Sequence, residues 1–298
     1  MLQIMRRAMC GLLPAMLLAA PAWGQHDTPG NVITLDYAIA ETLQALGEPP
    51  EALGGLSGYR VWWRDPQALP AVVELGSRHL PNLELIQDIA PSHILISPPA
   101  HANLVPQLSR LAALKEWTIY QQGTPLSERL DGLTEQLGEL AGVRSHADEY
   151  LQGVRAQLEI LATHFQNHDQ ATQPLVLVSL MDERHARVFG QGSLENLVLE
   201  QLGLRNGWDG EVNRWGFATV TAGQLFELEG RVMLLESPYS AAGTQQTLLE
   251  RGIWQYWPAV TRQEATTLSV AYWHWGGWHS ALRFATSLVE ALGPHEMP

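Results

Sequence analysis

The sequence contains almost no cysteine and almost no lysine. Its single cysteine, Cys10, lies close to the N-terminus, and Lys115 is its only lysine. Asp and Glu number 31 against 18 Lys and Arg, so the formal net charge is −13. An acidic chain without a basic run is a poor match for the phosphate backbone of nucleic acid. We therefore expect no nucleic-acid partner.

The usual signatures of catalysis are missing as well. The sequence has no G-x-S-x-G element and no phosphate-binding loop. The segment "MDERH" at 181–185 brings two acids and a histidine together, but such residues at the end of a strand are commonly solvated charges. We expect a protein that is not an enzyme, and a two-lobed periplasmic enzyme remains the alternative from another class.

Long hydrophobic runs are also lacking, apart from one short run near the start. Arg6 and Arg7 precede an apolar stretch at 12–20, and "APAWG" supplies small residues just before Gln25. This order is typical of a secretory signal peptide over residues 1–24, and the apolar stretch is too short to span a membrane. Because Cys10 directly follows "RRAM", it lacks the apolar run that precedes a lipid-modified cysteine. We expect a soluble exported protein that is cleaved near Gln25.

Removal of this segment leaves roughly 270 residues without any cysteine, enough for one large core or two modest ones. Residues 1–24 hold two arginines and no acid, so their removal changes the net charge from −13 to −15. An exported chain that needs no disulfide suits the bacterial periplasm.

Alternating strands and helices fill the first part of the mature chain. Val32, Ile33 and Leu35 form a buried-strand pattern, and Asp36 is placed to cap a helix that ends before Gly47. Further strands are predicted at 94–96 and 117–120, with an amphipathic helix at 126–142. This alternation predicts a parallel sheet covered by helices, in an N-terminal α/β lobe over residues 30–142.

A long helical pattern without proline then interrupts this alternation of strands and helices. Ser145 is a plausible N-cap, with Asp148 three residues on, and an apolar stripe continues to Phe165. About 24 residues of helix would reach about 36 Å, the size of a small domain. We interpret residues 143–170 as a helix connecting two lobes.

Residues 171–298 repeat the strand and helix pattern and predict a C-terminal α/β lobe. Its last strand, "TTLSVAY", leads directly into Trp273, Trp275 and Trp278. Ligands of open α/β sheets bind beyond the carboxyl ends of strands. That position favours a ligand surface over core packing for this tryptophan cluster, although both remain open. Alternation places Trp273 and Trp275 on one face, and Trp278 is expected to begin the closing helix as a packing residue.

The order of several motifs resembles one family over nearly the whole mature chain. These motifs are "YRVWW", "VVELGSRHLPNLELIQDIAPSHIL", "DERHARVFG", "GWDGEVNRWG" and "VAYWHWGG". Together they resemble the periplasmic binding proteins for ferric hydroxamate siderophores. The resemblance implies two α/β lobes joined by one long helix, with the ligand cleft between the lobes.

The resemblance also implies a set of ligand-binding residues. Arg78 matches an arginine that contacts the iron-bound hydroxamate oxygens, and the remaining positions match aromatic residues of the cleft: Trp62, Trp215, Trp273 and Trp275. Two positions depart from the family pattern. Ala100 or His101 stands where the family has a tyrosine, and Arg214 stands where an apolar residue is common.

The chemistry of such a ligand fits these residue types. A ferric tris-hydroxamate is compact and roughly neutral, with an apolar body around polarised oxygens. Aromatic rings offer contact area at little entropy cost, and a guanidinium donates two hydrogen bonds in a fixed geometry. Because the siderophore fills the coordination sphere of iron, we expect no protein metal site and no cofactor. His164 and His168, spaced i and i+4, are the one alternative pair for zinc.

These inferences combine into one expectation. We expect a monomeric periplasmic protein that captures a ferric hydroxamate siderophore and delivers it to the permease of an inner-membrane ABC importer. A catecholate siderophore, haem or cobalamin is the alternative ligand. A ferric catecholate carries about three negative charges and would need several convergent cations. Besides Arg78, the sequence offers only Arg60, Arg64 and Arg214 for that purpose.

Overall fold

The structure, a computed structural model, describes residues 30–165, 173–239 and 244–292 of the chain. The expected signal peptide, Cys10 and His168 lie outside these ranges.

The first lobe is built on a parallel five-stranded sheet in the order β3-β2-β1-β6-β7. Its strands are β1 Val32–Thr34, β2 Ala52–Leu53, β3 Val73–Glu74, β6 His93–Ile96 and β7 Ala113–Glu116. The helices around it are α1 Tyr37–Ala45, α2 Leu56–Trp62, α3 Leu83–Ile89 and the short α4 Val105–Leu108. A two-stranded hairpin, β4 Gly76–Ser77 and β5 Leu80–Pro81, stands apart from the sheet. The parallel sheet expected for this lobe is confirmed.

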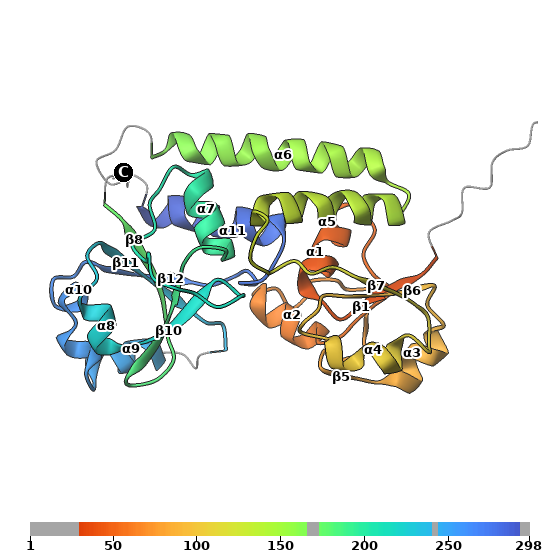
Figure 1. Cartoon of the computed structure of the whole chain (residues 1–298), viewed down its shortest axis with the longest axis horizontal. Helices are drawn as coiled ribbons and strands as arrows, with labels where there is room; N and C mark the ends of the chain where they lie inside the picture. The colour runs from red at the N-terminus through yellow and green to blue at the C-terminus, as the bar shows by residue number, and fades with distance from the viewer. Residues whose placement is uncertain (1–29, 166–172, 240–243, 293–298) are drawn as a thin grey trace, which may run out of the picture.

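Two long helices lead from the first lobe to the second. These are α5 Leu126–Leu140 and α6 Arg144–Thr163, which pack side by side. Figure 1 shows α6 running across the top of both lobes, with α5 beneath it. The described part of α6 has 20 residues, so it is long enough at 1.5 Å per residue to reach from one lobe to the other.

The second lobe has a mixed sheet in the order β10-β9-β8-β11-β12. Strands β8, β11 and β12 are parallel, whereas β9 runs antiparallel to both β8 and β10. The strands are β8 Leu175–Leu180, β9 His185–Phe189, β10 Phe217–Thr221, β11 Arg231–Glu236 and β12 Ala265–Ser269. The helices of this lobe are α7 Leu194–Gln201, α8 Ala222–Phe226, α9 Thr244–Glu250, α10 Pro258–Thr261 and α11 Trp278–Leu292.

The largest hydrophobic core is shared between the lobes. It takes residues from α1 and α5 of the first lobe, from α6, and from α7 and α11 of the second lobe. Each sheet has a further core of its own on its other face. In the ranges the structure covers, we find no helix with both the length and the apolar character that crossing a membrane requires.

Two local expectations were wrong. The strand expected at 117–120 lies at Ala113–Glu116 instead, because the helix before it ends at Leu108 and the chain turns earlier than its apolar pattern indicates. The expected cap Ser145 lies inside α6, whose N-cap is Val143. The tight turn from α5 brings Val143 into position, and its amide donates to the carbonyl of Gly138.

Candidate functional site: an aromatic cleft between the lobes

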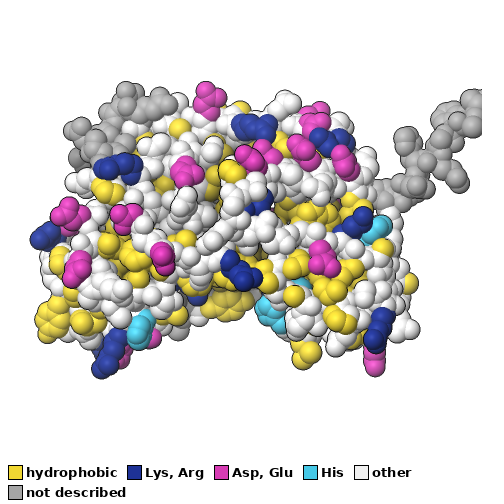
Figure 2. All heavy atoms as spheres, in the orientation of Figure 1, with side chains coloured by type: hydrophobic (Ala, Val, Ile, Leu, Met, Phe, Trp, Pro, Cys, Tyr) yellow, Lys and Arg dark blue, Asp and Glu magenta, His cyan; other side chains and the backbone are white. Residues whose placement is uncertain are grey.

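A cleft of about 400 Å³ lies between the two lobes. Figure 2 shows hydrophobic side chains gathered where the surface is hollowed between them. The first lobe and the segment after β7 contribute Asp36, Tyr37, Trp62, Arg78, His79, Ser97, Ala100 and Tyr120. The second lobe contributes Trp215, Phe217, Tyr239, Trp273 and Trp275.

Arg78 reaches the cleft from the turn of the β4–β5 hairpin. Its Nη2 lies 3.5 Å from Oδ2 of Asp36, and both side chains are largely buried. The guanidinium also stacks over two rings, at 4.7 Å from the centroid of Tyr37 and 5.3 Å from that of Trp273. Its buried Nε has no hydrogen-bond partner among the described residues. Arg78 is therefore held from two sides while part of its donor capacity is unused.

Asp36 is positioned by the start of α1. As the N-cap, its Oδ1 accepts hydrogen bonds from the amides of Ala38 (2.8 Å) and Ile39 (3.2 Å). Burial raises the pKa of Asp36, and this outweighs the opposing effects of Arg78 and the two amides. In its ionised form the carboxylate offsets the charge of Arg78 inside the cleft.

The tryptophans of the cleft form a chain of edge-to-face contacts. Trp62 lies 4.9 Å from Trp273, Trp273 lies 4.9 Å from Trp275, and the three planes are inclined by 70–72° at each step. Trp215 continues the chain at 6.1 Å from Trp275, whose Nε1 donates to the Trp215 carbonyl. Such arrangements are the favoured geometry of aromatic pairs. The result is a semi-rigid apolar surface that crosses from one lobe to the other.

The loop after β12 is anchored from behind by His274. Its Nδ1 donates to Oε1 of Glu195 on α7 at 2.5 Å, and its ring stacks on Phe189 at 4.8 Å. Both His274 and Glu195 are buried. Because His274 faces inward, its neighbours Trp273 and Trp275 face the cleft. The alternation expected from the sequence therefore agrees with the structure.

The two glycines that follow make the next turn possible. A Cβ on Gly276 would lie 2.5 Å from Cβ of Ser280, which is too close for any side chain. The carbonyl of Gly276 accepts from the Tyr120 hydroxyl at 2.7 Å, and the amide of Gly277 donates to Glu41. Trp278 then begins α11 as a buried residue, as expected.

All five residues singled out by the sequence line this one cleft: Arg78, Trp62, Trp215, Trp273 and Trp275. Trp63, the neighbour of Trp62 in the sequence, is buried beside Tyr59 and does not line the cleft. Both tryptophans lie at the end of helix α2. Adjacent helical residues differ by about 100°, which separates the two rings. That these residues bind a ligand stays a prediction.

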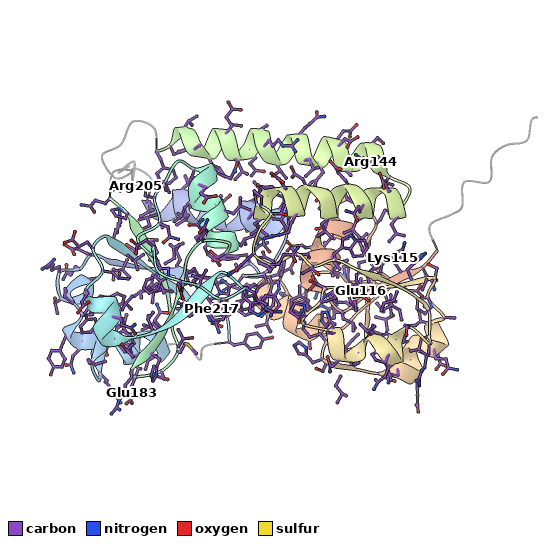
Figure 3. The ribbon with its side chains drawn as sticks, in the orientation of Figure 1. Lys115, Glu116, Arg144, Glu183, Arg205 and Phe217 are labelled. Carbon is purple, nitrogen blue, oxygen red and sulfur yellow. The ribbon has the colours of Figure 1, made fainter. Side chains whose placement is uncertain are left out.

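Sequence reasoning missed several lining residues. Tyr37, Tyr120 and Tyr239 belong to three separate segments, and Phe217 follows "NRWG" without having been assigned. Figure 3 shows Phe217 at the junction of the lobes. The proximity of Phe217 to the "NRWG" motif was the one available signal. Nothing in the sequence reveals which tyrosines meet across a cleft.

The alternative metal site has no support in the described ranges. No group of three His, Cys, Asp or Glu side chains there could hold a metal ion. His164 is exposed at the end of α6, and its proposed partner His168 lies outside the described residues. Within the cleft, burial and the charge of Arg78 lower the pKa of His79, so its ring is neutral near pH 7.

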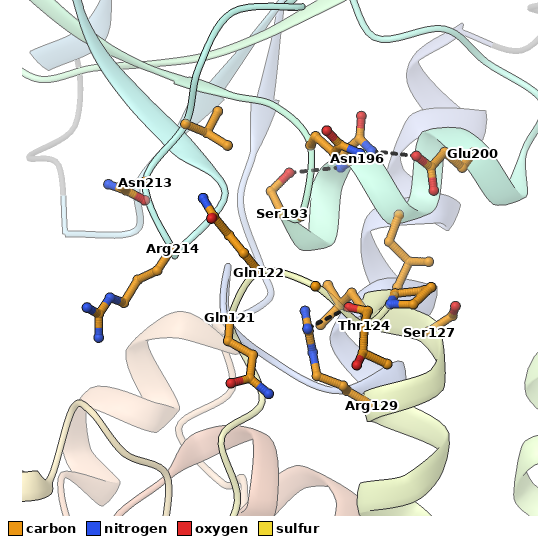
Figure 4. Close-up of a pocket in the computed structure, with 17 residues that line it drawn as sticks. Gln121, Gln122, Thr124, Ser127, Arg129, Ser193, Asn196, Glu200, Asn213 and Arg214 are labelled. Carbon is orange, nitrogen blue, oxygen red and sulfur yellow. Dashed lines mark hydrogen bonds between the residues drawn. The ribbon is translucent and has the colours of Figure 1, made fainter.

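A second hollow of about 430 Å³ lies beside the cleft, and polar and apolar groups share its lining. Figure 4 shows Arg214 and Asn213 on one side of it, Arg129 on another, and α7 with Ser193 at its start. Arg214 is exposed and does not line the aromatic cleft. Arg129 donates to the Thr124 carbonyl at 2.6 Å, and Asn196 donates to Glu200. Because all five residues singled out by the sequence line the aromatic cleft and none of them lines this hollow, we place the candidate site in the cleft.

Comparisons with known proteins agree with this architecture. The family model described as "periplasmic binding protein" matches residues 32–268. The chain is 28% identical over 288 residues to the iron(3+)-hydroxamate-binding protein FhuD of Escherichia coli, with 95% of each chain covered. It is 26% identical over 287 residues to the achromobactin-binding periplasmic protein of Dickeya dadantii, covering 91% of this chain and 88% of that protein.

Solved structures confirm the fold. The crystal structure of Fe³⁺–Desferal-bound FhuD from Vibrio cholerae matches with a TM-score of 0.80 at 22% identity, over 89% of this chain and 99% of that one. The triscatecholate siderophore-binding protein FeuA of Bacillus subtilis matches with a TM-score of 0.71 at 15% identity, over 88% and 92% of the two chains. The expected arrangement of two α/β lobes and a long connecting helix is therefore confirmed.

Proposed function

Because the chain belongs to the periplasmic binding protein family, we propose that it captures a ferric hydroxamate siderophore in the aromatic cleft and delivers it to an inner-membrane ABC importer. Its role is binding without catalysis, and it works as a monomer in the periplasm after cleavage near Gln25. Iron is the cargo, held through the siderophore, and the protein carries no cofactor of its own.

The observation that carries this proposal is the chemistry of the cleft lining. Four tryptophans from both lobes line the cleft together with the guanidinium of Arg78, which lies beside the carboxylate of Asp36. Aromatic faces suit the apolar body of the complex, and the free donors of Arg78 suit its oxygens. The relationship to the iron(3+)-hydroxamate-binding protein of Escherichia coli supports the same class of ligand.

The orientation of the other arginines argues against a ferric catecholate. Arg60 donates to the carbonyls of Ala68 and Leu69, and Arg64 donates to the carbonyl of Val270. Neither lines the cleft, and Arg214 does not line it either. Arg78 is the one arginine among the described residues that line the cleft, so a complex with about three negative charges would find too few compensating cations in the lining, and burying it would be costly.

Native mass spectrometry of the purified mature protein with a panel of ligands tests the proposal. The panel holds ferric trihydroxamates, a ferric tricatecholate, haem and cobalamin. We expect a one-to-one complex with ferric trihydroxamates that retains iron. A tighter complex with the catecholate, haem or cobalamin, or no complex with any ferric hydroxamate, would contradict the proposal.

A further inference from the structure

Arg187 occupies a position on the second lobe that the proposed function has not used. It lies in β9, opposite Ser179 of β8 and Thr219 of β10. Side chains in a strand alternate between faces, so Arg187 shares a face with Phe189 and, across the pair, with Phe217. Its neighbours Ala186 and Val188 point to the other face, into the separate core of the second lobe. Arg187 therefore stands on the same face of the sheet as Phe217, which lines the cleft.

Ring contacts place its guanidinium against the wall of the cleft. The guanidinium carbon lies 4.2 Å from the ring centroid of Phe217 and 5.6 Å from that of Trp275. Both rings line the aromatic cleft, whereas Arg187 lies against them and is not itself among the lining residues. Cation–π contacts orient the group, but they leave its five N–H donors free for hydrogen bonds in the plane of the guanidinium.

The described residues of the protein do not use those donors. Arg187 makes no hydrogen bond and no ion pair with the residues of 30–165, 173–239 and 244–292, and its buried Nε lacks a partner. Burial lowers the pKa of Arg187, and the charge of Glu195 offsets part of that effect. Glu195 itself is occupied by His274 and by the hydroxyl of Tyr272.

The balance of charge differs between the two sides of the cleft, one formed by each lobe. On the first lobe, Arg78 faces Asp36 and the pair is neutral overall. On the second lobe, Arg187 has no ion-pair partner among the described residues, and Glu195, whose charge acts on it, is already hydrogen-bonded to His274 and Tyr272. A ligand that reaches past the rings of Phe217 and Trp275 would remove water from this guanidinium, and a buried cation without an acceptor is costly. A neutral ligand would not compensate for the lost hydration of the Arg187 guanidinium.

The geometry points to a ligand that is a ferric hydroxamate carrying one carboxylate, with the carboxylate bound by Arg187 on the second lobe. This inference rests on the proposed function and adds the charge of the complex, −1, to it. Arg187 is then a specificity-determining residue, because a planar guanidinium can hold a carboxylate through two parallel hydrogen bonds.

A charge series on one scaffold tests the inference. Desferrioxamine B is a linear trihydroxamate with one terminal amine, so its ferric complex is cationic. Acetylation of the amine makes the complex neutral, and succinylation adds a carboxylate and makes it anionic. The iron centre is unchanged throughout, and calorimetry measures the three dissociation constants for each protein variant.

We expect the wild-type protein to bind the succinyl complex roughly tenfold or more tightly than the acetyl complex. The reason is that only the succinyl complex has a carboxylate that can form a charge-assisted hydrogen bond with Arg187. Arg187→Gln should reduce this ratio to about twofold, because the charge-assisted hydrogen bond to the carboxylate is lost. The affinity for the acetyl complex should stay the same. Arg187→Lys should retain part of the ratio, because the charge remains without the fork. Arg184→Gln, an equal charge change at an exposed residue of the same lobe that does not line the cleft, should leave the ratio unchanged.

Several outcomes would overturn the inference. Equal affinity of the wild-type protein for the succinyl and acetyl complexes would do so, as would an unchanged ratio in folded Arg187→Gln or Arg187→Lys. The wild-type ratio needs no variant, so the test stands even if a variant fails to fold. Failure of all three ferric complexes to bind would instead overturn the proposed function itself.

Discussion

Arg78 combines two roles that a substitution can separate. It closes an ion pair with Asp36, and it offers free donors to the cleft. Arg78→Ala should weaken ferric hydroxamate binding by about 1.5–3 kcal/mol, the range for hydrogen bonds to charged groups. Arg78→Lys should recover only part, because a point charge cannot reproduce the fork. Calorimetry on both variants checks this expectation, with Arg184→Ala as a control at an exposed residue. Full affinity in a folded Arg78→Ala protein would show that Arg78 serves only the ion pair with Asp36.

The tryptophans at positions 273, 275 and 278 should respond to substitution in two opposite ways. Trp273 and Trp275 line the cleft and are half-buried, whereas Trp278 is buried and its Nε1 donates to Asp131 at 2.8 Å. Trp273→Ala and Trp275→Ala should each cut affinity with little loss of stability. Trp278→Ala should cost about 3–5 kcal/mol of unfolding free energy, as large-to-small core changes do.

Aromatic replacement supplies the matched control for that series. Trp275→Tyr should keep most of the binding, because the ring provides the contact. A thermal melt beside a ligand titration for each variant makes the measurement. If the Trp273 and Trp275 variants melt far lower while Trp278→Ala loses only the ligand, the assignment of faces is reversed.

At the residue scale, the sequence predicted those site residues that sit in recognisable motifs. Arg78 and the four tryptophans all came from such motifs, and all five line one cleft. Asp36 was predicted as a helix cap but not as the partner of Arg78, because the two are 42 positions apart and meet only once β1 and the β4–β5 hairpin are in place. Arg187 was visible in "RHARVFG", but its direction depends on the pairing of β9 with β10.

At the scale of elements, the start of α11 depends on a side chain from the other lobe. Glu41 of α1 accepts hydrogen bonds from the amides of Gly277 and Ser280 and from the hydroxyl of Ser280. It therefore satisfies donors at a helix N-terminus that would otherwise lack partners. Burial raises the pKa of Glu41 from 4.5 to about 8, although these hydrogen bonds act in the opposite direction.

This shift predicts a pH-dependent stability with a definite sign. Between pH 4.5 and about 8, Glu41 is ionised in the unfolded chain but protonated in the folded one. The folded state then binds more protons, so the free energy of unfolding falls as pH rises through this window. Glu41→Gln keeps a neutral acceptor and removes the effect. We expect the variant to gain stability relative to wild type between pH 5 and pH 8 in denaturant titrations, and a constant or shrinking difference would contradict the assignment.

Element boundaries were predictable where a capping residue marks them. Asp36, Asn82 and Ser193 cap α1, α3 and α7 through their side chains, and the cap at Asp36 was expected from the sequence. The start of α6 was misplaced because Val143 caps it without any side-chain hydrogen bond. The turn that follows α5 fixes this start, and a turn of that kind leaves little trace in the pattern of apolar residues.

At the scale of the whole molecule, the two lobes are held together by more than the connecting helix. The largest core runs through both of them. Hydrogen bonds also cross between the lobes: Tyr120 to Gly276, Trp278 to Asp131, Arg64 to Val270, Arg283 to Trp63, and Glu41 with Gly277 and Ser280. A wide hinge motion would break these contacts, so ligand binding should tilt the lobes only slightly.

Small-angle X-ray scattering of the free and loaded protein checks this expectation. We expect the two scattering profiles to overlay, since hinge closure around a ligand would shrink the molecule visibly. A clear decrease in the radius of gyration on loading with a ferric trihydroxamate would show that the two lobes move together despite the core they share. Loading should be verified on the same sample by the absorbance of the ferric complex.

The central claim is that a ferric siderophore sits in the aromatic cleft without any bond from protein to iron. Diffraction from co-crystals with a ferric trihydroxamate, collected at the iron absorption edge, tests it most directly. We predict one strong anomalous peak between Arg78 and the rings of Trp273 and Trp275, with six siderophore oxygens around the metal and no protein atom in its coordination sphere. A peak outside this cleft, or a protein side chain bound to the iron, would contradict the account.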